Sequence, residues 1–281
     1  MSTISAAAVR AFRERTGLPL MDCKKALTEA GGDENKAIEI LREQGEKLDL
    51  KRGDRETAFG RFGVYAGLDK PAGAIVELKC ESAPVTQNEE FITLANALAE
   101  ALAKNKVDSV DELLKLKCPA KPSMTLGEHR SELFNRIREK FEVGRFARFE
   151  GSTGAYSHNA GTVAGVLVGV EGGSDEAAKD VAMHVAAMRP AALSADELDK
   201  AEVDRERELL RKAALQEGKP ESIVDKMVEG RLKQYFAQQT LLDQPFVKDD
   251  KQSVGDYAKS KGMKVKKFEC FVLGEVPRQG E

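Results

Sequence analysis

The sequence predicts an α+β fold in which a small three-helix module precedes a two-part core of antiparallel sheet with helices, and a helical hairpin is inserted late in the chain. Apolar residues at helical spacing fill residues 1–47. Apolar runs typical of strands then recur at 62–80, 163–170 and 264–273. Between the last two lie two long, charged helical segments joined by a Gly-Lys-Pro sequence.

Three short helices are expected in the N-terminal module. Ser5 is a suitable N-cap for the first helix, and Thr16-Gly17 ends it. The second helix covers residues 20–30, and several of its side chains tend to one side: Met21, Cys23, Ala26, Leu27 and Ala30. A third helix covers residues 35–42, and the charged stretch 46–56 that follows is either its extension or a linker.

The first part of the core begins with two strands, 62–65 and 74–80, separated by a turn-rich sequence and predicted to form a hairpin. Alternation in the second strand predicts that one face is buried and the other faces water. Helices are expected at 91–103 and from Asp108. A capping box, TLGE (125–128), precedes the helical sequence 132–141.

The remaining elements begin with a second strand-rich segment. In chain order they are a strand at 145–150, a turn at 151–161, a buried strand at 163–170, a helix at 175–188, two long helices at 194–217 and 220–237, and a final strand at 264–273. The glycine and proline at 218–220 suit the end of one helix and the start of the next. An arm of this kind, inserted in a sheet domain, is typical of a contact with another chain.

These elements predict four units. Residues 1–50 form the helical module with its linker, and residues 51–144 form the N-terminal part of the core. The C-terminal part of the core is discontinuous, 145–193 with 238–281, because the hairpin arm 194–237 is inserted in it.

Composition excludes several classes of protein. Among 281 residues, 44 lysines and arginines stand against 47 aspartates and glutamates, so direct nucleic-acid binding is not expected. No apolar run approaches the roughly 20 residues needed to cross a bilayer. The N-terminus lacks a cationic segment followed by an apolar one, so we expect a cytoplasmic protein, with a processed organelle protein as the alternative.

No catalytic or metal-binding motif is visible in the sequence. Three histidines and four cysteines are scattered without the spacing of a metal site, and the cysteines suit buried free thiols in a reducing compartment. A thiol-dependent enzyme that uses Cys80, for example with His158, is one alternative. The residues favour an interaction protein that needs no cofactor.

Several stretches, taken together and in order, resemble the elongation factor Ts family over essentially the whole chain. They are RERTG (13–17), MDCKKALTEA (21–30), GD (32–33), NEEF (88–91), RFARFE (145–150), the histidine-containing turn before GVLV (165–168), MHVAAMRP (183–190), GKPE (218–221), VEGRL (228–232) and QPFVKD (244–249). The resemblance implies that the N-terminal module is UBA-like. It also implies a guanine-nucleotide exchange factor that releases GDP from elongation factor Tu without covalent catalysis.

The resemblance assigns partner-binding positions in two parts of the chain. In the first module, four residues match family positions that contact the nucleotide-binding domain of the GTPase: Arg13, Leu20, Met21 and Lys24. Family members often have methionine at the position of Leu20. The alternative for Leu20 and Met21 is the core of the helical bundle. His158 matches a histidine that contacts a distal domain of the partner, and its alternative is an ordinary turn residue. Phe246 and Val247 match positions near that contact or belong to the core.

A departure from the family pattern occurs at CESAPV (80–85), between a strand and a helix. The resemblance implies Cys-x-Thr-Asp-Phe-Val here, with the Asp-Phe pair as a tip that pushes into the GTPase. Ser82, Ala83 and Pro84 stand in place of Thr, Asp and Phe. Proline fixes its own φ and restricts Ala83, so the tip is stiffer, smaller and uncharged. Two hypotheses follow: a working exchange factor, or a paralogue that binds elongation factor Tu with weak or no exchange.

The arm leaves the oligomeric state open. The resemblance allows a homodimer through residues 194–237 or a projecting arm. The apolar positions of the arm, which suit pairing within the hairpin or with a second copy, are Leu198, Val203, Leu209, Leu210, Ile223, Met227, Leu232 and Phe236.

Overall fold

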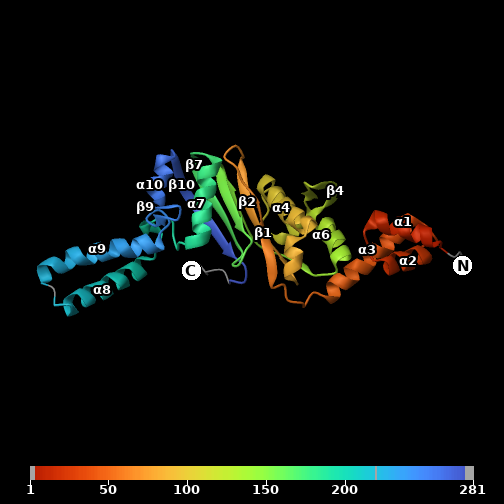
Figure 1. The fold of residues 1–281 in the computed structure, drawn as a ribbon, viewed down its shortest axis with the longest axis horizontal. Helices are drawn as coiled ribbons and strands as arrows, with labels where there is room; N and C mark the ends of the chain where they lie inside the picture. The colour runs from red at the N-terminus through yellow and green to blue at the C-terminus, as the bar shows by residue number, and fades with distance from the viewer. Residues whose placement is uncertain (1–3, 219, 276–281) are drawn as a thin grey trace.

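The computed structural model describes residues 4–218 and 220–275 (Figure 1). The molecule is elongated, with the N-terminal helices at one end, the sheets in the middle and the arm at the other end. The predicted α+β class is confirmed, since three helices precede antiparallel sheets that are covered by helices, and a helical pair projects from them.

The N-terminal module consists of α1 (Ala6–Thr16), α2 (Leu20–Glu29) and α3 (Glu34–Lys51). The Ser5 side chain accepts a hydrogen bond from the Ala8 amide, and Gly17 ends α1 with a φ of 69°, a conformation that glycine adopts without strain. The helices share a small core of Val9, Phe12, Cys23, Ala26, Leu27, Ala37 and Leu41. Because α3 runs to Lys51, the charged stretch after residue 46 begins as a helical extension.

The first sheet has the order β1-β2-β5 and is antiparallel throughout. Its strands are β1 (Phe59–Tyr65), β2 (Ala72–Cys80) and β5 (Phe141–Glu150). One face is covered by α4 (Glu89–Lys104), whose apolar side packs on Val76, Leu78 and Cys80. The segment between β2 and β5 also contains η1 (Ala83–Gln87), α5 (Val110–Lys115), β3 (Lys117–Cys118), β4 (Lys121–Thr125) and α6 (Leu126–Ile137).

The capping box at the start of α6 is confirmed, because Thr125 and Glu128 exchange hydrogen bonds with each other's backbone amides. The helical sequence extends less far than expected, because α6 ends at Ile137 and Phe141 already belongs to β5. Arg138 stops the helix in a left-handed conformation, with a φ of 63°.

The second sheet has the order β10-β7-β6. Its strands are β6 (Thr153–His158), β7 (Ala164–Gly172) and β10 (Met263–Val272), and α7 (Asp175–Met188) covers one face. The expected turn at 151–161 is wrong for most of its length, because β6 occupies it. Its short alternating sequence becomes a strand only through pairing with the strongly apolar β7.

The two sheets face each other across a layer formed by Phe62, Ile75, Phe149 and Leu167. The prediction of a water-facing side for β2 is therefore wrong, because the second sheet covers that side. Glu77 on this face is 4% exposed and forms an ion pair with Arg145, with Nη2 and Oε1 2.8 Å apart. A buried carboxylate is tolerated only with such a partner.

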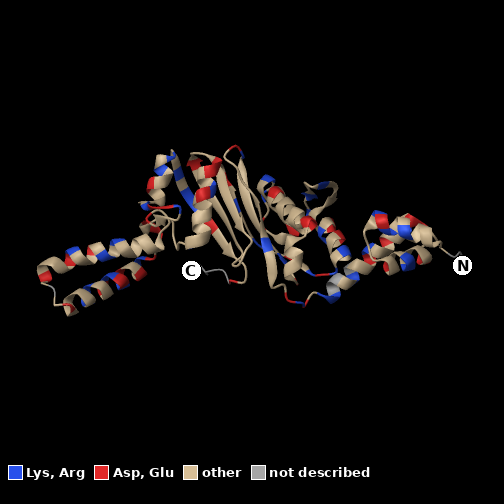
Figure 2. Ribbon diagram, in the orientation of Figure 1, with Lys and Arg blue, Asp and Glu red and all other residues tan. Residues whose placement is uncertain are grey.

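The arm consists of η2 (Ala195–Glu197), α8 (Lys200–Gln216) and α9 (Glu221–Gln239). Its helices pack through a narrow apolar seam that contains Ala214, Val224, Val228, Leu232, Leu210 and Phe236. Positive and negative residues alternate along both helices (Figure 2), and some form ion pairs between them, such as Arg211 with Asp225. The chain then forms β8 (Pro245–Phe246), β9 (Asp249–Ser253) and α10 (Val254–Ser260), none of which was predicted.

Among the residues that the structure describes, no helix has the length and apolarity to cross a membrane. In the same residues, no group of three or more His, Cys, Asp or Glu side chains is arranged to hold a metal ion.

Candidate partner-binding surface

The segment Ser82-Ala83-Pro84, which we call the tip, connects β2 to η1 at one end of the first sheet. Ser82 is extended, and Pro84 lies in the first turn of η1, where its missing amide proton costs no hydrogen bond. Ala83 and Pro84 are exposed, and the buried Val85 that follows anchors η1 to the core under α4. The tip therefore presents two small apolar residues on a fixed base.

Glu139 holds the tip from the side. Its carboxylate accepts hydrogen bonds from the Ser82 amide at 3.0 Å and from the Ser82 hydroxyl at 2.5 Å. Hydrogen bonds to a charged acceptor are about twice as strong as neutral ones, and two from one residue fix its orientation as well as its position.

Glu81, directly before the tip, is bound to two other segments. It accepts from the Lys140 amide at 2.6 Å and pairs with Arg55 at 2.8 Å. Burial by itself raises the pKa of this carboxyl, but the Lys140 amide and the Arg55 guanidinium outweigh it, so that the pKa lies below its ordinary value. Glu81 thus stays charged and ties the tip to the chain between α3 and β1.

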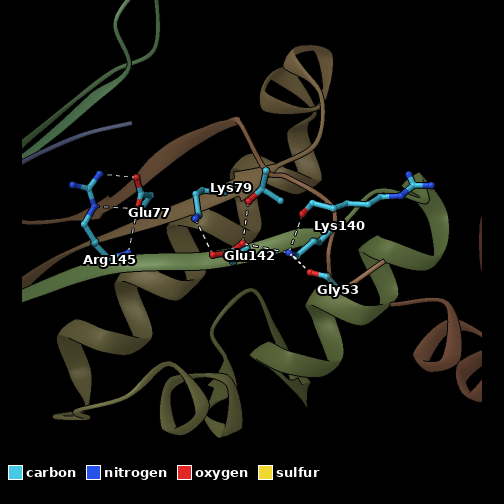
Figure 3. A network of polar contacts seen from close by, with 8 residues as sticks. Gly53, Glu77, Lys79, Lys140, Glu142 and Arg145 are labelled. Carbon is cyan, nitrogen blue, oxygen red and sulfur yellow. Dashed lines mark hydrogen bonds and ion pairs between the residues drawn. The ribbon is translucent and has the colours of Figure 1, made fainter. Parts of the chain in front are cut away.

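Three consecutive residues, Arg138, Glu139 and Lys140, connect the tip to the rest of the molecule. We call them the 138–140 segment. Arg138 forms an ion pair with Asp22 on α2, and Glu139 holds Ser82. The Lys140 ammonium donates to the carbonyl oxygens of Gly53 at 2.6 Å and Arg55 at 3.0 Å (Figure 3). One short segment after α6 therefore contacts the N-terminal module, the tip and the linker.

The four N-terminal candidates, Arg13, Leu20, Met21 and Lys24, are all exposed. Leu20 is 44% exposed and Met21 59%, although both are large and apolar. Met21 does not share the buried side of α2 with Cys23, Ala26 and Leu27 as its spacing suggested. The alternative that Leu20 and Met21 form the bundle core is wrong, and an exposed pair of this kind suits a contact with another protein.

His158 is the last residue of β6 and is half-buried, with its Nδ1 atom 3.1 Å from the Tyr156 hydroxyl. The Ser157 hydroxyl donates to the Phe62 carbonyl, and Gly67 bridges Thr153, so β6 runs antiparallel beside β1. This arrangement brings the end of β6 to the end of the sheets where β1 starts and β2 leads into the tip. The structure thus places His158 at the same end as the tip, whereas the four N-terminal candidates lie on a separate module.

Cys80 has the properties of a core thiol. It is fully buried, and burial, followed by the negative charge of Glu139, raises its pKa to about 12. Its Sγ donates to the Ser82 carbonyl at 3.3 Å, whereas His158 pairs with Tyr156. A thiol with this pKa supplies almost no thiolate near neutral pH, which argues against the thiol-dependent enzyme.

The two other candidates near the His158 contact, Phe246 and Val247, differ in burial. Phe246 is buried and stacks on Tyr257 with ring centroids 4.2 Å apart, while Val247 is exposed. The Val247 amide donates to Nδ1 of His184 at 3.1 Å, and Nε2 of that ring lies 2.9 Å from the Gln244 oxygen. His184 therefore orients this loop and is itself buried.

Sequence reasoning missed the 138–140 segment. Its residues are charged and lie within the predicted helical sequence 132–141, where charged side chains indicate only a solvated helix face. Only the left-handed turn at Arg138 aims three successive side chains at three different neighbours, and a non-glycine residue in that conformation has no reliable sequence signal.

Comparison with known proteins assigns the family. The family model described as elongation factor TS matches residues 84–275. Proteins named elongation factor Ts from Azoarcus sp. (strain BH72) and Bordetella petrii are 40% and 41% identical to this chain, over 98% of it and 92% and 93% of their own lengths. One from Clostridium perfringens (strain SM101 / Type A) is 42% identical over 97% of this chain and 93% of its own length. The chain belongs to the elongation factor Ts family.

Proposed function

We propose that this chain promotes release of GDP from elongation factor Tu through the surface formed by the tip and the N-terminal module. Its membership of the elongation factor Ts family makes it a nucleotide exchange factor and not an enzyme with covalent chemistry. The observation that carries the proposal is the near full-length match to proteins of that name.

Exchange of this kind follows from linkage. A protein that binds the nucleotide-free GTPase more tightly than the GDP-bound form weakens GDP binding by the same factor. The free energy for opening the nucleotide site therefore comes from contacts with the factor. Rigid contacts are effective here, because little conformational entropy is lost when they bind.

The proposed partner contacts are of two kinds. On the N-terminal module they are Arg13, Leu20, Met21 and Lys24, and on the core they are the tip and His158. What supports the first set is the exposure of Leu20 and Met21, and what supports the second is the common position of the tip and His158 at one end of the sheets.

We also propose that the tip replaces the Thr-Asp-Phe sequence of the family. Its side chains are small and uncharged, and this favours the second candidate function, a paralogue that binds elongation factor Tu and exchanges weakly. The hydrogen bonds of Glu81 and Glu139 favour a working factor instead. Because they hold the tip in place, the tip need not change its own conformation when it contacts the GTPase.

The arm is proposed to mediate a homodimer. Leu209, Leu215 and Ile223 are 54%, 46% and 42% exposed, because other apolar residues already fill the contact between α8 and α9. We propose that residues 194–237 act as a separate unit. The other proposed units are the N-terminal module, residues 1–50, and a core in two parts, 51–144 and 145–193 with 238–281. Strand β5 crosses the boundary between these two parts of the core. Light scattering at micromolar concentration tests the dimer, and a monomeric mass contradicts it.

Release of a fluorescent GDP analogue from the organism's own elongation factor Tu tests the exchange function. A variant with Ser82→Thr, Ala83→Asp and Pro84→Phe runs beside the natural chain. Strong acceleration by the natural chain supports the exchange factor. Binding without acceleration, together with acceleration by the variant, supports the paralogue, and no binding by either protein contradicts both.

A further inference from the structure

One large apolar side chain stays exposed beside the tip. Phe59, the first residue of β1, is 42% exposed. The other large apolar side chains exposed in the described part of the chain are Leu20, Met21, Met188, Leu209, Leu215, Ile223 and Val247. Phe59 is the one aromatic residue in this set, and it belongs to the strand that borders the tip.

The register of the sheet places Phe59 next to the tip. Its Cα pairs with that of Cys80, and the tip begins two residues after Cys80. Residues 59, 61 and 63 of β1 share a face, because side chains alternate along a strand. On this face a Cβ at Gly63 would meet the backbone of Ala95 on α4, and the Arg61 guanidinium donates to the Thr86 carbonyl of η1 at 2.7 Å. Phe59 therefore lies on the side of the sheet that faces η1 and α4, at the end of β1 next to the tip.

The surroundings of Phe59 are fixed. The chain that enters β1 is held by the Lys140 ammonium, which binds the Gly53 and Arg55 carbonyls, and by the Thr57 hydroxyl, which donates to Glu142 at 3.0 Å. Directly after the neighbouring strand β2, Glu81 and Ser82 are hydrogen-bonded to the 138–140 segment. Phe59 and the tip thus lie at the paired ends of β1 and β2, and the chain on both sides is held by hydrogen bonds.

An aromatic residue in this position has the character of an interface anchor. Interface binding energy concentrates in a few buried residues, with Trp, Tyr and Arg most enriched, and aromatic rings in general supply large apolar area with little rotamer entropy. Ala83 and Pro84 bury little area by comparison. We propose that Phe59 is the apolar anchor of the tip contact with elongation factor Tu and that Phe59 and the tip form one continuous contact surface. This inference rests on the proposed function.

The test compares Phe59→Ser and Phe59→Leu with the natural chain in the GDP-release assay. Phe59→Ser is expected to lower kcat/KM for exchange at least 10-fold, and Phe59→Leu, which keeps apolar area, to lower it about 3-fold. Ala120→Ser is the control, since this residue is also exposed and apolar but lies in the turn between β3 and β4, outside every proposed contact surface. It is expected to change exchange less than 2-fold.

A photoreactive residue keeps the test decisive even where Phe59→Ser folds poorly. Phe59→p-benzoylphenylalanine retains the aromatic ring and is expected to cross-link to elongation factor Tu, whereas Ala120→p-benzoylphenylalanine is not. Normal exchange by a folded Phe59→Ser protein, or absence of the cross-link from position 59 in an active complex, overturns the anchor. Failure of the natural chain to accelerate release overturns the proposed function instead, so the two failures are distinguishable.

Discussion

The proposed contact residues of the N-terminal module and the tip are built in opposite ways. Leu20 and Met21 are large, apolar and exposed, and they lie on the N-terminal module, which touches the core where α3 packs on α6 and through the Asp22–Arg138 ion pair. The tip has small side chains, but Glu139 and the neighbours of Glu81 hold it in place. This difference leads us to propose that the module provides apolar contact area for the partner and that the tip provides a contact held in a fixed position, and the following predictions test this division.

The largest effect is expected from removing apolar area on the module. Leu20→Ser combined with Met21→Ser is expected to weaken binding to nucleotide-free elongation factor Tu by about 2–4 kcal/mol, because both side chains are candidate anchors. The melting temperature should stay unchanged, since neither residue belongs to the module core. Titration calorimetry measures the affinity, with Thr28→Ser, an exposed position on the same helix, as the control. Unchanged affinity would show that the module is not a docking surface.

Loosening the tip is expected to affect exchange more than affinity. Glu139→Gln removes the charge that accepts two hydrogen bonds from Ser82, and each such bond contributes about 1.5–3 kcal/mol. We expect GDP release at saturating factor to slow about 10-fold, while the dissociation constant changes less. Stopped-flow measurements at several factor concentrations separate the two.

Glu150→Gln, an exposed carboxylate at the far end of β5, is the control for this change. A variant of Glu139 that loses affinity and keeps its maximal rate would reverse the proposed roles of module and tip.

The connection between the two regions is testable at Arg138. Arg138→Gly removes the ion pair with Asp22, which as a partly exposed pair is worth about 0.2–1 kcal/mol. It also relieves the left-handed backbone at φ 63°, a gain of about 1 kcal/mol for glycine. Global stability in urea should therefore change little.

The local consequence is expected in the module alone. Amide hydrogen exchange in α2 should accelerate in Arg138→Gly, while β1 and β2 stay protected. Asp22→Asn should reproduce this pattern without the backbone change. Equal acceleration in the sheets would mean that the 138–140 segment stabilises the whole protein and does not specifically attach the module.

The smallest effect concerns pH and is confined to the core. Burial lowers the pKa of His129 and of His184, in the latter case against an opposing hydrogen bond to Gln244. The folded state therefore binds fewer protons on these rings than the unfolded chain does as the pH falls below about 6.5. Their contribution to stability is fully present above that pH and is lost progressively as the pH falls below it, toward the lower pKa values of the folded state.

Urea unfolding at pH 7.5 and 5.5 checks this sign, with His184→Gln expected to reduce the difference. The N-terminal module contains no histidine, so hydrogen exchange in α1–α3 should show little of the change. Higher stability at pH 5.5 would contradict the assignment of the buried histidines.

Local sequence was sufficient for several elements. The Ser5 cap, the Gly17 stop and the Thr125 capping box were predicted because they depend on residues within one turn of each other. The helices of the arm were predicted for the same reason, whereas the residues proposed to contact the partner come from the family resemblance alone. For Leu20 and Met21 the bundle core remained the alternative to a partner contact, because spacing alone does not say which side of a short helix faces the bundle.

Tertiary structure decided what depends on neighbours far along the chain. β6 is a strand because β7 pairs with it, and β2 is buried on both faces because the second sheet covers the side that alternation assigned to water. The 138–140 segment connects residues up to 116 positions apart through one left-handed turn. Sequence patterns record the local preferences of the backbone, whereas the rigidity of the tip and the position of Phe59 arise from contacts that only the folded chain creates.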